Sequence, residues 1–286
     1  MKIAIIDFAR KNGRDPKSIG STWLRSDNLV TKDKDFFHWT QGAESDAIIF
    51  QKVYWEEMMR LYKKPKILDL CDPDFIKGLI QGGIDLKQIS LVVDAITCSS
   101  PKLTEQVKKY VDIPVYHVAD RLNFDLFPDP KNHVGRAKTV VWFGYAGNAK
   151  QVLQYYILEA LASHGLDLLV VSNEGFNPPD KYGINIKNVH YESDTAYYEI
   201  QQGDMFINPP CLTNANFKYK SNNKTVIAWK LGLPLADGPE EIEKYLSAEA
   251  RNEESTKRIK EVNDNYQIEQ SGQDYKRIIN EIQRTK

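Results

Sequence analysis

The sequence has few cysteines and no long apolar run. Its three cysteines, Cys71, Cys98 and Cys211, are an odd number with wide spacing, which indicates reduced thiols rather than a disulfide framework. No stretch approaches the roughly 18 consecutive apolar residues of a membrane-spanning helix. The apolar run near Met1 is also too short for a signal peptide. We therefore expect a soluble, cytoplasmic protein without a transmembrane segment.

The sequence also lacks an excess of either charge. Lys and Arg together number 38, and Asp and Glu number 39. No overall electric field therefore attracts the protein to nucleic acid or to a membrane. The nearly neutral charge makes nucleic acid a partner that is not favoured. It stays possible, because a local basic groove would suffice to bind it. Any site for an anion must be local.

Several motifs that bind nucleotides or carry nucleophiles are absent. The chain has no G-K-[ST] phosphate loop, no G-x-G-x-x-G dinucleotide fingerprint and no G-x-S-x-G nucleophile elbow. No group of His, Cys and Asp has the spacing of metal ligands, so we expect neither a metal nor a cofactor. These absences argue most strongly against a nicotinamide-dependent enzyme.

What the sequence does contain is a repeated alternation of short apolar strands and amphipathic helices. Its 286 residues suit two domains of about 130 residues each better than one core. The first half holds five expected strands, at Lys2–Phe8, Asp46–Lys52, Lys64–Leu70, Leu91–Ser100 and Ile113–Ala119. Continuous β-branched runs separated by helices of about ten residues predict parallel strands that are buried on both faces.

The alternation breaks at Asp120–Lys138, a stretch rich in Pro, Asp and Asn that we interpret as a linker, and then restarts. The expected strands of the second half are Thr139–Gly147, Leu166–Glu174, Ile186–Glu192, Asp204–Pro210 and Leu233–Ala236. The pattern predicts an α/β fold with two doubly wound, Rossmann-like domains, residues 1–125 and 126–250, that face a central cleft. Residues 251–286 are expected to form C-terminal helices, and the last of these is a candidate to cross back to the first domain.

The most informative stretch is "FKYKSNNKTVIAWKLGLPLA", Phe217 to Ala236, which predicts a helix with an unusually basic start. The free N–H groups and positive dipole end of a helix start attract anions, and nearby lysines suit a diphosphate. Candidate diphosphate ligands here are Lys218, Lys220, Ser221, Asn222, Lys224 and Thr225. The structural alternative is a serine N-cap flanked by solvated lysines. Lysines at a helix start oppose the dipole, which favours the functional interpretation.

Other candidates follow expected strands, where open α/β sheets bind ligands. A glycine turn with Gly144, Gly147 and Asn148 lets a ligand approach the backbone, although such turns are also common for packing. Arg25 follows a loop with Gly13 and Gly20 that suits phosphate or is simply a surface loop. Asp69 and Asp72 end a strand, Asp94 lies within one without an evident partner, and His117 ends another. A carboxylate or histidine in such a place serves as a general base or has a purely structural role.

Taken in order, these segments resemble a glycosyltransferase of the GT-B fold. The resemblance is carried by "DAIIFQKVY", "KPKILDLCDPD", "VDAITCSSPKLTEQV", "IPVYHVADR", "VVWFGYAGN", "FINPP" and "KSNNKTVIAWKLGLPLA". It implies a C-terminal domain that binds a nucleotide-sugar donor and an N-terminal domain that holds an acceptor of unknown identity. The diphosphate would lie on Lys220, Ser221, Asn222 and Lys224, assisted by Arg25 and the glycine turn, with no metal.

The resemblance also implies further roles. Asp72 or His117 would be the catalytic base if transfer inverts the sugar, and Glu174 or the backbone near His190 and Tyr191 would contact the nucleoside. The chain looks like a compact member of the family 1 or 4 type, and it departs from many retaining members. Their paired glutamates are replaced here by Tyr219 and Ile227.

Three alternatives stay open. One is a non-catalytic protein of the same fold that binds a nucleotide or sugar, and another is a nucleotide-sugar epimerase. The third is a transferase whose acceptor is a modified base in nucleic acid.

Overall fold

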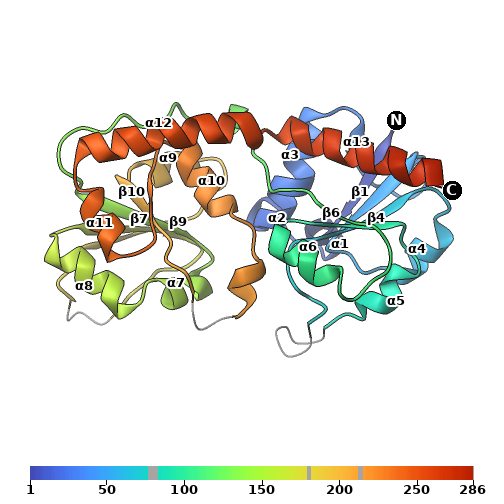
Figure 1. Ribbon diagram of the computed structural model, residues 1–286, viewed down its shortest axis with the longest axis horizontal. Coiled ribbons are helices and arrows are strands. Elements are labelled where there is room, and N and C mark those ends of the chain that lie inside the picture. Colours follow the sequence, from blue (N-terminus) through green and yellow to red (C-terminus); the bar gives the residue numbers. More distant parts are fainter. Residues whose placement is uncertain (77–82, 179–181, 212–214, 286) are drawn as a thin grey trace. The chain divides into compact units, whose positions relative to one another are not determined.

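The computed structural model describes residues 1–76, 83–178, 182–211 and 215–285, which form two compact units (Figure 1). Unit 1 comprises Met1–Asn123, Ala215–Asn222 and Tyr266–Lys286, and unit 2 comprises Phe124–Asn214 and Asn223–Asn265. The first division therefore falls two residues before the boundary expected from the sequence. The C-terminal helices, which the sequence groups together, are divided between the units.

Unit 1 is built on a six-stranded, wholly parallel sheet in the order β2-β1-β3-β4-β5-β6. Its strands are β1 (Ile3–Asp7), β2 (Phe36–His38), β3 (Ala47–Gln51), β4 (Lys66–Leu70), β5 (Ala95–Cys98) and β6 (Val115–His117). Its helices are α1 (Phe8–Lys11), α2 (Gly20–Thr22), α3 (Asn28–Lys32), α4 (Glu56–Leu61), α5 (Leu86–Ser90), α6 (Pro101–Val107) and α13 (Ile268–Thr285). A π-helical turn, η2 (Trp23–Asp27), joins α2 to α3, and 3-10 turns lie at η1 (Pro16–Ser18) and η5 (Ala215–Tyr219).

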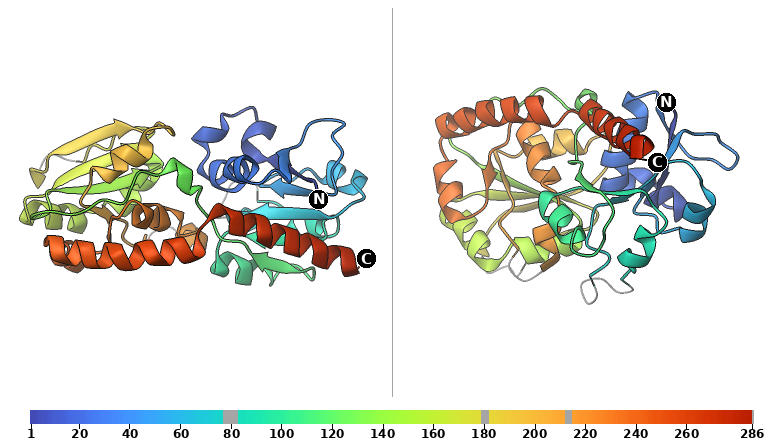
Figure 2. Two further views of the ribbon diagram at one scale, coloured as in Figure 1. Left: turned by 90° about the horizontal axis from the view of Figure 1, so that it is seen from above. Right: turned by 45° about the vertical axis from the view of Figure 1, so that its right-hand side comes forward.

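Alternate residues of the strands pack on opposite faces of this sheet, as expected for strands covered on both sides. Ala4 and Ile6 of β1 join a core with α4, α5 and α6, whereas Ile3 and Ile5 join a core with α3 and α13. The views of Figure 2 agree that α13, in red, lies along the sheet of unit 1 beside α3. The last helix of the chain is thus part of unit 1.

Unit 2 is built on a five-stranded parallel sheet in the order β11-β10-β7-β8-β9. Its strands are β7 (Thr139–Gly144), β8 (Asp167–Ser172), β9 (Ile186–His190), β10 (Met205–Ile207) and β11 (Leu235–Ala236). Its helices are α7 (Ala146–Val152), α8 (Tyr155–Ser163), α9 (Ala196–Gln201), α10 (Asn223–Lys230), α11 (Pro239–Lys244) and α12 (Ala248–Asn265), with a 3-10 turn η3 (Phe124–Leu126). Within this unit α12 packs along α10, and α11 packs on α8.

The two parallel sheets with flanking helices confirm the predicted α/β fold of two doubly wound, Rossmann-like domains. Some details differ from the prediction. The strand β2 was not expected, and the predicted strand Leu91–Ser100 is ordered as a strand only over Ala95–Cys98. The carboxylate of Asp94, which had no evident partner in the sequence, accepts a hydrogen bond from the backbone N–H of Lys66 at 2.8 Å. In the described part of the chain, no helix is long and apolar enough to cross a membrane.

The pH dependence of unit 2 should reflect Asp204, which precedes β10. Its carboxylate accepts hydrogen bonds from the backbone N–H groups of Lys138 and Thr139, and Lys131 Nζ lies 3.1 Å away. Burial alone would raise the pKa of Asp204, but these donors and Lys131 outweigh it and lower the pKa below its ordinary value of 3.8. A lowered folded-state pKa stabilises the fold above the unfolded pKa, and this stabilisation is lost as pH falls through the folded value.

We therefore expect Asp204→Asn to lower the free energy of unfolding at about pH 7 by about 1–3 kcal/mol, with a smaller loss near pH 3. Urea denaturation of both proteins at the two pH values measures this difference. An equal loss at both pH values would show that the charge of Asp204 contributes nothing.

Candidate functional site

Each sheet reverses its strand order at one point, and that point defines where a doubly wound domain binds ligands. In unit 2 the reversal lies between β7 and β10, and in unit 1 it lies between β1 and β3. The residues that follow the carboxyl ends of these strands are therefore the first to consider. In unit 2 they are the Gly144 turn after β7 and, beyond β10, the start of α10.

Gly144 and Lys224 come together at the reversal of unit 2. Gly144 ends β7 with a φ of +142°, a backbone conformation that residues with a side chain rarely adopt. The Lys224 side chain fills the space where a β-carbon on Gly144 would lie, with its Cε 2.7 Å from that position. The ammonium of Lys224 also lies 4.7 Å from the centre of the Trp142 ring. A positive charge is thus held at the carboxyl end of β7.

The first turn of α10 adds to this arrangement. The helix has eight residues and begins at Asn223, so Lys224 and the buried Thr225 lie in its first turn, where free N–H groups and the dipole favour an anion. The glycine turn offers fewer free N–H groups to a ligand. The N–H of Ala146 is bound to Asn173 Oδ1 at 2.9 Å, and a β-carbon at Gly147 would lie 3.1 Å from the Tyr145 ring. Asn148 lies within α7, and its N–H bonds the carbonyl of Tyr145.

The other predicted diphosphate ligands of the basic stretch lie outside α10, in the segment Ala215–Asn222 that belongs to unit 1. Lys220 Nζ lies 3.5 Å from Asp72 Oδ1, and Ser221 Oγ donates to Asp120 Oδ2 at 2.5 Å. Asn222 Nδ2 donates to the Tyr266 hydroxyl at 3.0 Å, and Lys218 Nζ lies over the Tyr219 ring. These side chains are not the start of a helix, because the segment forms a 3-10 turn and a bend before α10.

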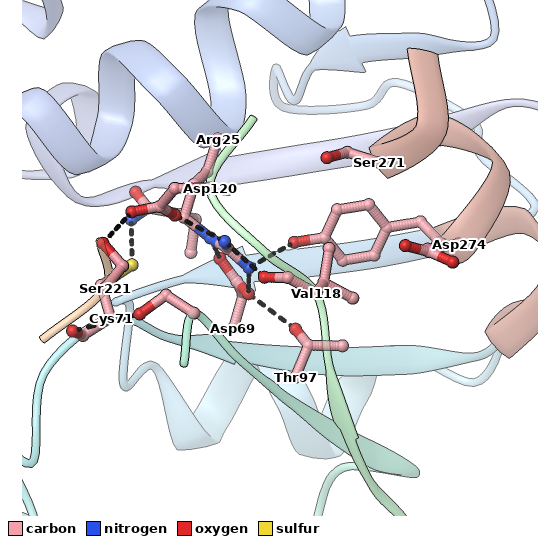
Figure 3. Close-up of polar contacts among 12 residues, drawn as sticks. Arg25, Asp69, Cys71, Thr97, Val118, Asp120, Ser221, Ser271 and Asp274 are labelled. Carbon is pink, nitrogen blue, oxygen red and sulfur yellow. Dashed lines mark hydrogen bonds and ion pairs between the residues drawn. The ribbon is translucent and has the colours of Figure 1, made fainter. Parts of the chain in front are cut away.

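Arg25 is the centre of a buried polar network in unit 1, shown in Figure 3. Its Nε and Nη2 donate to the two oxygens of Asp69 at 2.8 and 2.6 Å, and its Nη1 donates to Asp120 at 2.7 Å and to the Val118 carbonyl. Nη2 also contacts the Tyr275 hydroxyl at 3.1 Å. Burial opposes the charge, but the carboxylates outweigh it and raise the pKa of Arg25 well above its usual value.

All donor groups of Arg25 are therefore used inside unit 1, and the arginine is a structural ion-pair centre rather than a diphosphate ligand. The same network accounts for the position of Asp69, which was a candidate general base. Its carboxylate is completely buried and also accepts from the Thr97 hydroxyl.

The two predicted base residues differ in their surroundings. Asp72 is held by Lys52 Nζ at 2.5 Å and by Lys220. Burial raises its pKa, but the two lysines outweigh this and lower it, so Asp72 is a weak proton acceptor. His117 ends β6 and is exposed, while partial desolvation lowers its pKa and keeps the ring neutral at pH 7. The role of His117 as a base stays a prediction.

The predicted nucleoside contacts lie at the carboxyl ends of the neighbouring strands β8 and β9 of unit 2. Glu174 follows β8 and is exposed, and His190 ends β9 with its Nε2 3.8 Å from Glu192. Tyr191 is partly buried, and desolvation raises its pKa. The three residues share one edge of the sheet with Gly144, because all strands of the sheet are parallel.

The structure also brings together residues that the sequence did not group. The side chains of Asp7, Asp27 and His38, far apart in the chain, come within 4.8 Å of one another, a spacing that suits a metal ion. The guanidinium of Arg10 lies between the two carboxylates, 2.8 Å from Asp7 and 2.6 Å from Asp27. A cation therefore already pairs with both carboxylates of this cluster, and we assign no metal to it.

No protein-family model matches the sequence, and no curated protein matches it. Solved structures do match. A glycosyltransferase from Rickettsia africae ESF-5 superposes with a TM-score of 0.63 at 10% identity, covering 99% of this chain and 98% of that one. Anabaena Alr3699/HepE, solved in complex with UDP, gives 0.62 at 10% identity and covers 98% and 100%. TarM gives 0.62 at 9% identity over 88% of this chain, which spans 57% of the length of TarM.

These similarities, with the two parallel sheets, show that the chain has the GT-B glycosyltransferase fold. The expected resemblance is confirmed at the level of the fold.

Proposed function

We propose that the protein is a glycosyltransferase that takes a sugar from a nucleotide-diphosphate donor bound in unit 2. The observation that carries the proposal is the placement of Lys224 and the first turn of α10 beside Gly144, at the reversal of strand order in unit 2. A ligand is expected at that point of a doubly wound sheet. The local chemistry suits an anion, although the protein as a whole is nearly neutral.

The donor's chemistry explains the charge. In transfer, the bond between the sugar's anomeric carbon and the diphosphate oxygen breaks, and its electron pair leaves with the diphosphate. The acceptor oxygen forms the new bond and loses its proton. Lys224 and the N–H groups of α10 are positioned to stabilise the negative charge that grows on the departing diphosphate. Glu174, His190 and Tyr191 are proposed to contact the nucleoside from the same edge.

The similar solved structures support a nucleotide-sugar as the donor. HepE has been solved with UDP and with UDP-glucose, and the pneumococcal transferase GtfA with UDP and GlcNAc. We therefore propose a uridine diphosphate sugar as the first donor to test.

The test is a thermal-shift titration with UDP and UDP-glucose. A ligand at about a hundred times its dissociation constant stabilises the fold by roughly 2.7 kcal/mol. We expect this shift in the wild type and its loss in Lys224→Ala. The matched control is Lys230→Ala, which removes the same charge from the last turn of α10. It should keep the shift.

Two outcomes would count against the proposal. If neither UDP nor UDP-glucose, nor another nucleoside diphosphate, shifts the wild type, unit 2 does not bind a donor. If the ligands bind but UDP-glucose releases no UDP with any acceptor or water, the fold is used for binding alone.

A further inference from the structure

The ring of Trp142 forms part of the surroundings of Lys224 in unit 2. Trp142 and Gly144 are two positions apart on β7, so both face the same side of the sheet. A β-carbon at Gly144 would lie 3.5 Å from Trp142 Cη2 and 2.7 Å from Lys224 Cε. The ammonium of Lys224 lies 4.7 Å from the centre of the Trp142 ring. The end of the lysine side chain therefore lies against both the indole and the strand backbone at Gly144.

The indole N–H of Trp142 has no hydrogen-bond partner among the described residues, although the side chain is completely buried. An unpaired donor inside a protein costs free energy that a phenylalanine or leucine at the same position would avoid. Tryptophan is, however, the aromatic residue that attracts a cation most strongly. The choice of tryptophan here is therefore better explained by the cation on its ring than by the stability of the core.

A second tryptophan of unit 2 shows a cation on a ring in a purely structural pairing. The guanidinium of Arg258 lies 4.3 Å from the centre of the Trp229 ring, and it also pairs with Glu254 and Glu261. These carboxylates neutralise Arg258 within α12. The Trp142 ring is itself neutral, so its attraction holds the ammonium of Lys224 without cancelling the charge. The Trp142 pairing also differs in its place, because it lies at the reversal of strand order.

We propose that Trp142 is a positioning residue, whose ring face holds the ammonium of Lys224 at the carboxyl end of β7 to meet the diphosphate of the donor. The part that concerns the diphosphate rests on the proposed function. Lysine has a flexible stem, and fixing it before the ligand arrives lowers the entropy cost of binding. The diphosphate then meets an ammonium that is already in place. Trp142 itself makes no contact with the donor and acts through Lys224.

The first measurement is NMR spectroscopy of the full chain labelled with ¹³C at the Cε of its lysines, without any nucleotide. Protons over the face of an aromatic ring resonate upfield, so the Hε signal of Lys224 should be shifted upfield in the wild type. The signal is assigned by its absence in Lys224→Arg. The upfield shift should disappear in Trp142→Leu and should be partly kept in Trp142→Phe, because phenylalanine still offers a ring face.

The second measurement is the affinity of the same proteins for UDP and for uridine, which lacks the diphosphate. Trp142→Leu should lose roughly three- to tenfold in affinity for UDP, the effect of losing one cation–π contact. Its affinity for uridine should stay that of the wild type, because Lys224 meets only the diphosphate. Trp142→Phe should lose less affinity for UDP. If Trp142→Leu does not fold, Trp142→Phe gives the same comparison with a smaller expected change.

The matched control is Phe206→Leu. Phe206 is also completely buried, and it lies on β10, the strand that pairs with β7. This variant removes aromatic volume from the same core and leaves the ring at Lys224 in place. It should keep the upfield Lys224 signal and the wild-type affinity for UDP. All proteins are compared at a temperature at which circular dichroism shows them folded.

The proposal is overturned if the wild-type Lys224 signal lies among those of the other lysines, or if replacing Trp142 leaves it unshifted. It is also overturned if replacing Trp142 weakens UDP and uridine equally, as general damage to unit 2 would, or weakens neither. If the Lys224 signal depends on Trp142 but no nucleoside diphosphate binds the wild type, the ring places the lysine and the proposed function fails. If UDP binds through Lys224 and nothing depends on Trp142, the proposed function stands and the positioning role fails.

Discussion

Replacing Arg25 with methionine is expected to lower the free energy of unfolding of unit 1 by about 3–5 kcal/mol, the usual cost of leaving a buried charge without its partner. Arg25 is the cation that balances Asp69 and Asp120, which are 0% and 3% exposed. Methionine fits the volume of the arginine stem but offers no donor, so both carboxylates lose their charged partner in a site that water does not reach. Arg25→Lys should lower the free energy of unfolding by less than Arg25→Met does, because it keeps a positive charge. It should still be less stable than the wild type, because one ammonium cannot replace the several donors of the guanidinium.

The measurement is hydrogen exchange of peptides from β4 and β5 across a urea series, with peptides from β7 and β8 of unit 2 as the internal reference. The matched control is Arg277→Met on α13. Arg277 pairs with Glu281 at the surface and is 53% exposed, so its removal should cost at most about 1 kcal/mol. Equal behaviour of Arg25→Met and Arg277→Met would show that the buried network does not stabilise unit 1.

Gly144→Ala is expected to abolish the nucleotide-induced stabilisation of unit 2. A β-carbon at Gly144 would lie 2.7 Å from Lys224 Cε, so the lysine must leave its position at the end of β7. The φ of +142° adds backbone strain of about 1–3 kcal/mol for any residue with a side chain. We expect the affinity for UDP to fall at least roughly tenfold, which corresponds to about 1.4 kcal/mol.

Gly165→Ala is the control for strain alone. Gly165 lies between α8 and β8 with a φ of +62°, and nothing lies within 4 Å of the position of its β-carbon. It should lower stability without changing the affinity for UDP, as measured by the same thermal-shift titration. If Gly144→Ala also leaves the affinity unchanged, Lys224 does not need its place beside Gly144 to bind the ligand.

The alternation of strands and helices was predictable because buried parallel strands need continuous apolar runs. The strand β2 was not, since Phe36–His38 is only three residues long and follows a charged stretch. Its place at the edge of the sheet comes from its pairing with β1, and no local sequence pattern predicts that pairing. The division of the C-terminal helices was equally hidden, because the helices on which α12 and α13 pack, α10 and α3, are set by the fold and not by a local sequence pattern.

The candidate donor site was partly predictable. Lys224 and Gly144 each follow a recognisable strand, and the parallel sheet brings strand ends together. The sequence could not separate Lys224 from Lys218, Lys220 and Ser221, because the bend before Asn223 sends those residues to unit 1. Arg25 was misjudged for a related reason. Its carboxylate partners lie 44 and 95 positions further along the chain, so nothing local shows that its donors are already used.

The position of α13 has a consequence for how the protein is made. A ribosome releases β1 to β6 early, but the helix that covers Ile3, Ile5 and Ile49, and whose Tyr275 reaches Arg25, is the last described element to emerge. Until α13 is synthesised, one apolar face of the sheet stays exposed to solvent and can associate with other chains. Fusing a fast-folding partner ahead of Met1 would not shorten this wait. A chaperone that shields exposed apolar strands during synthesis would, in contrast, act in the interval when the chain most needs it.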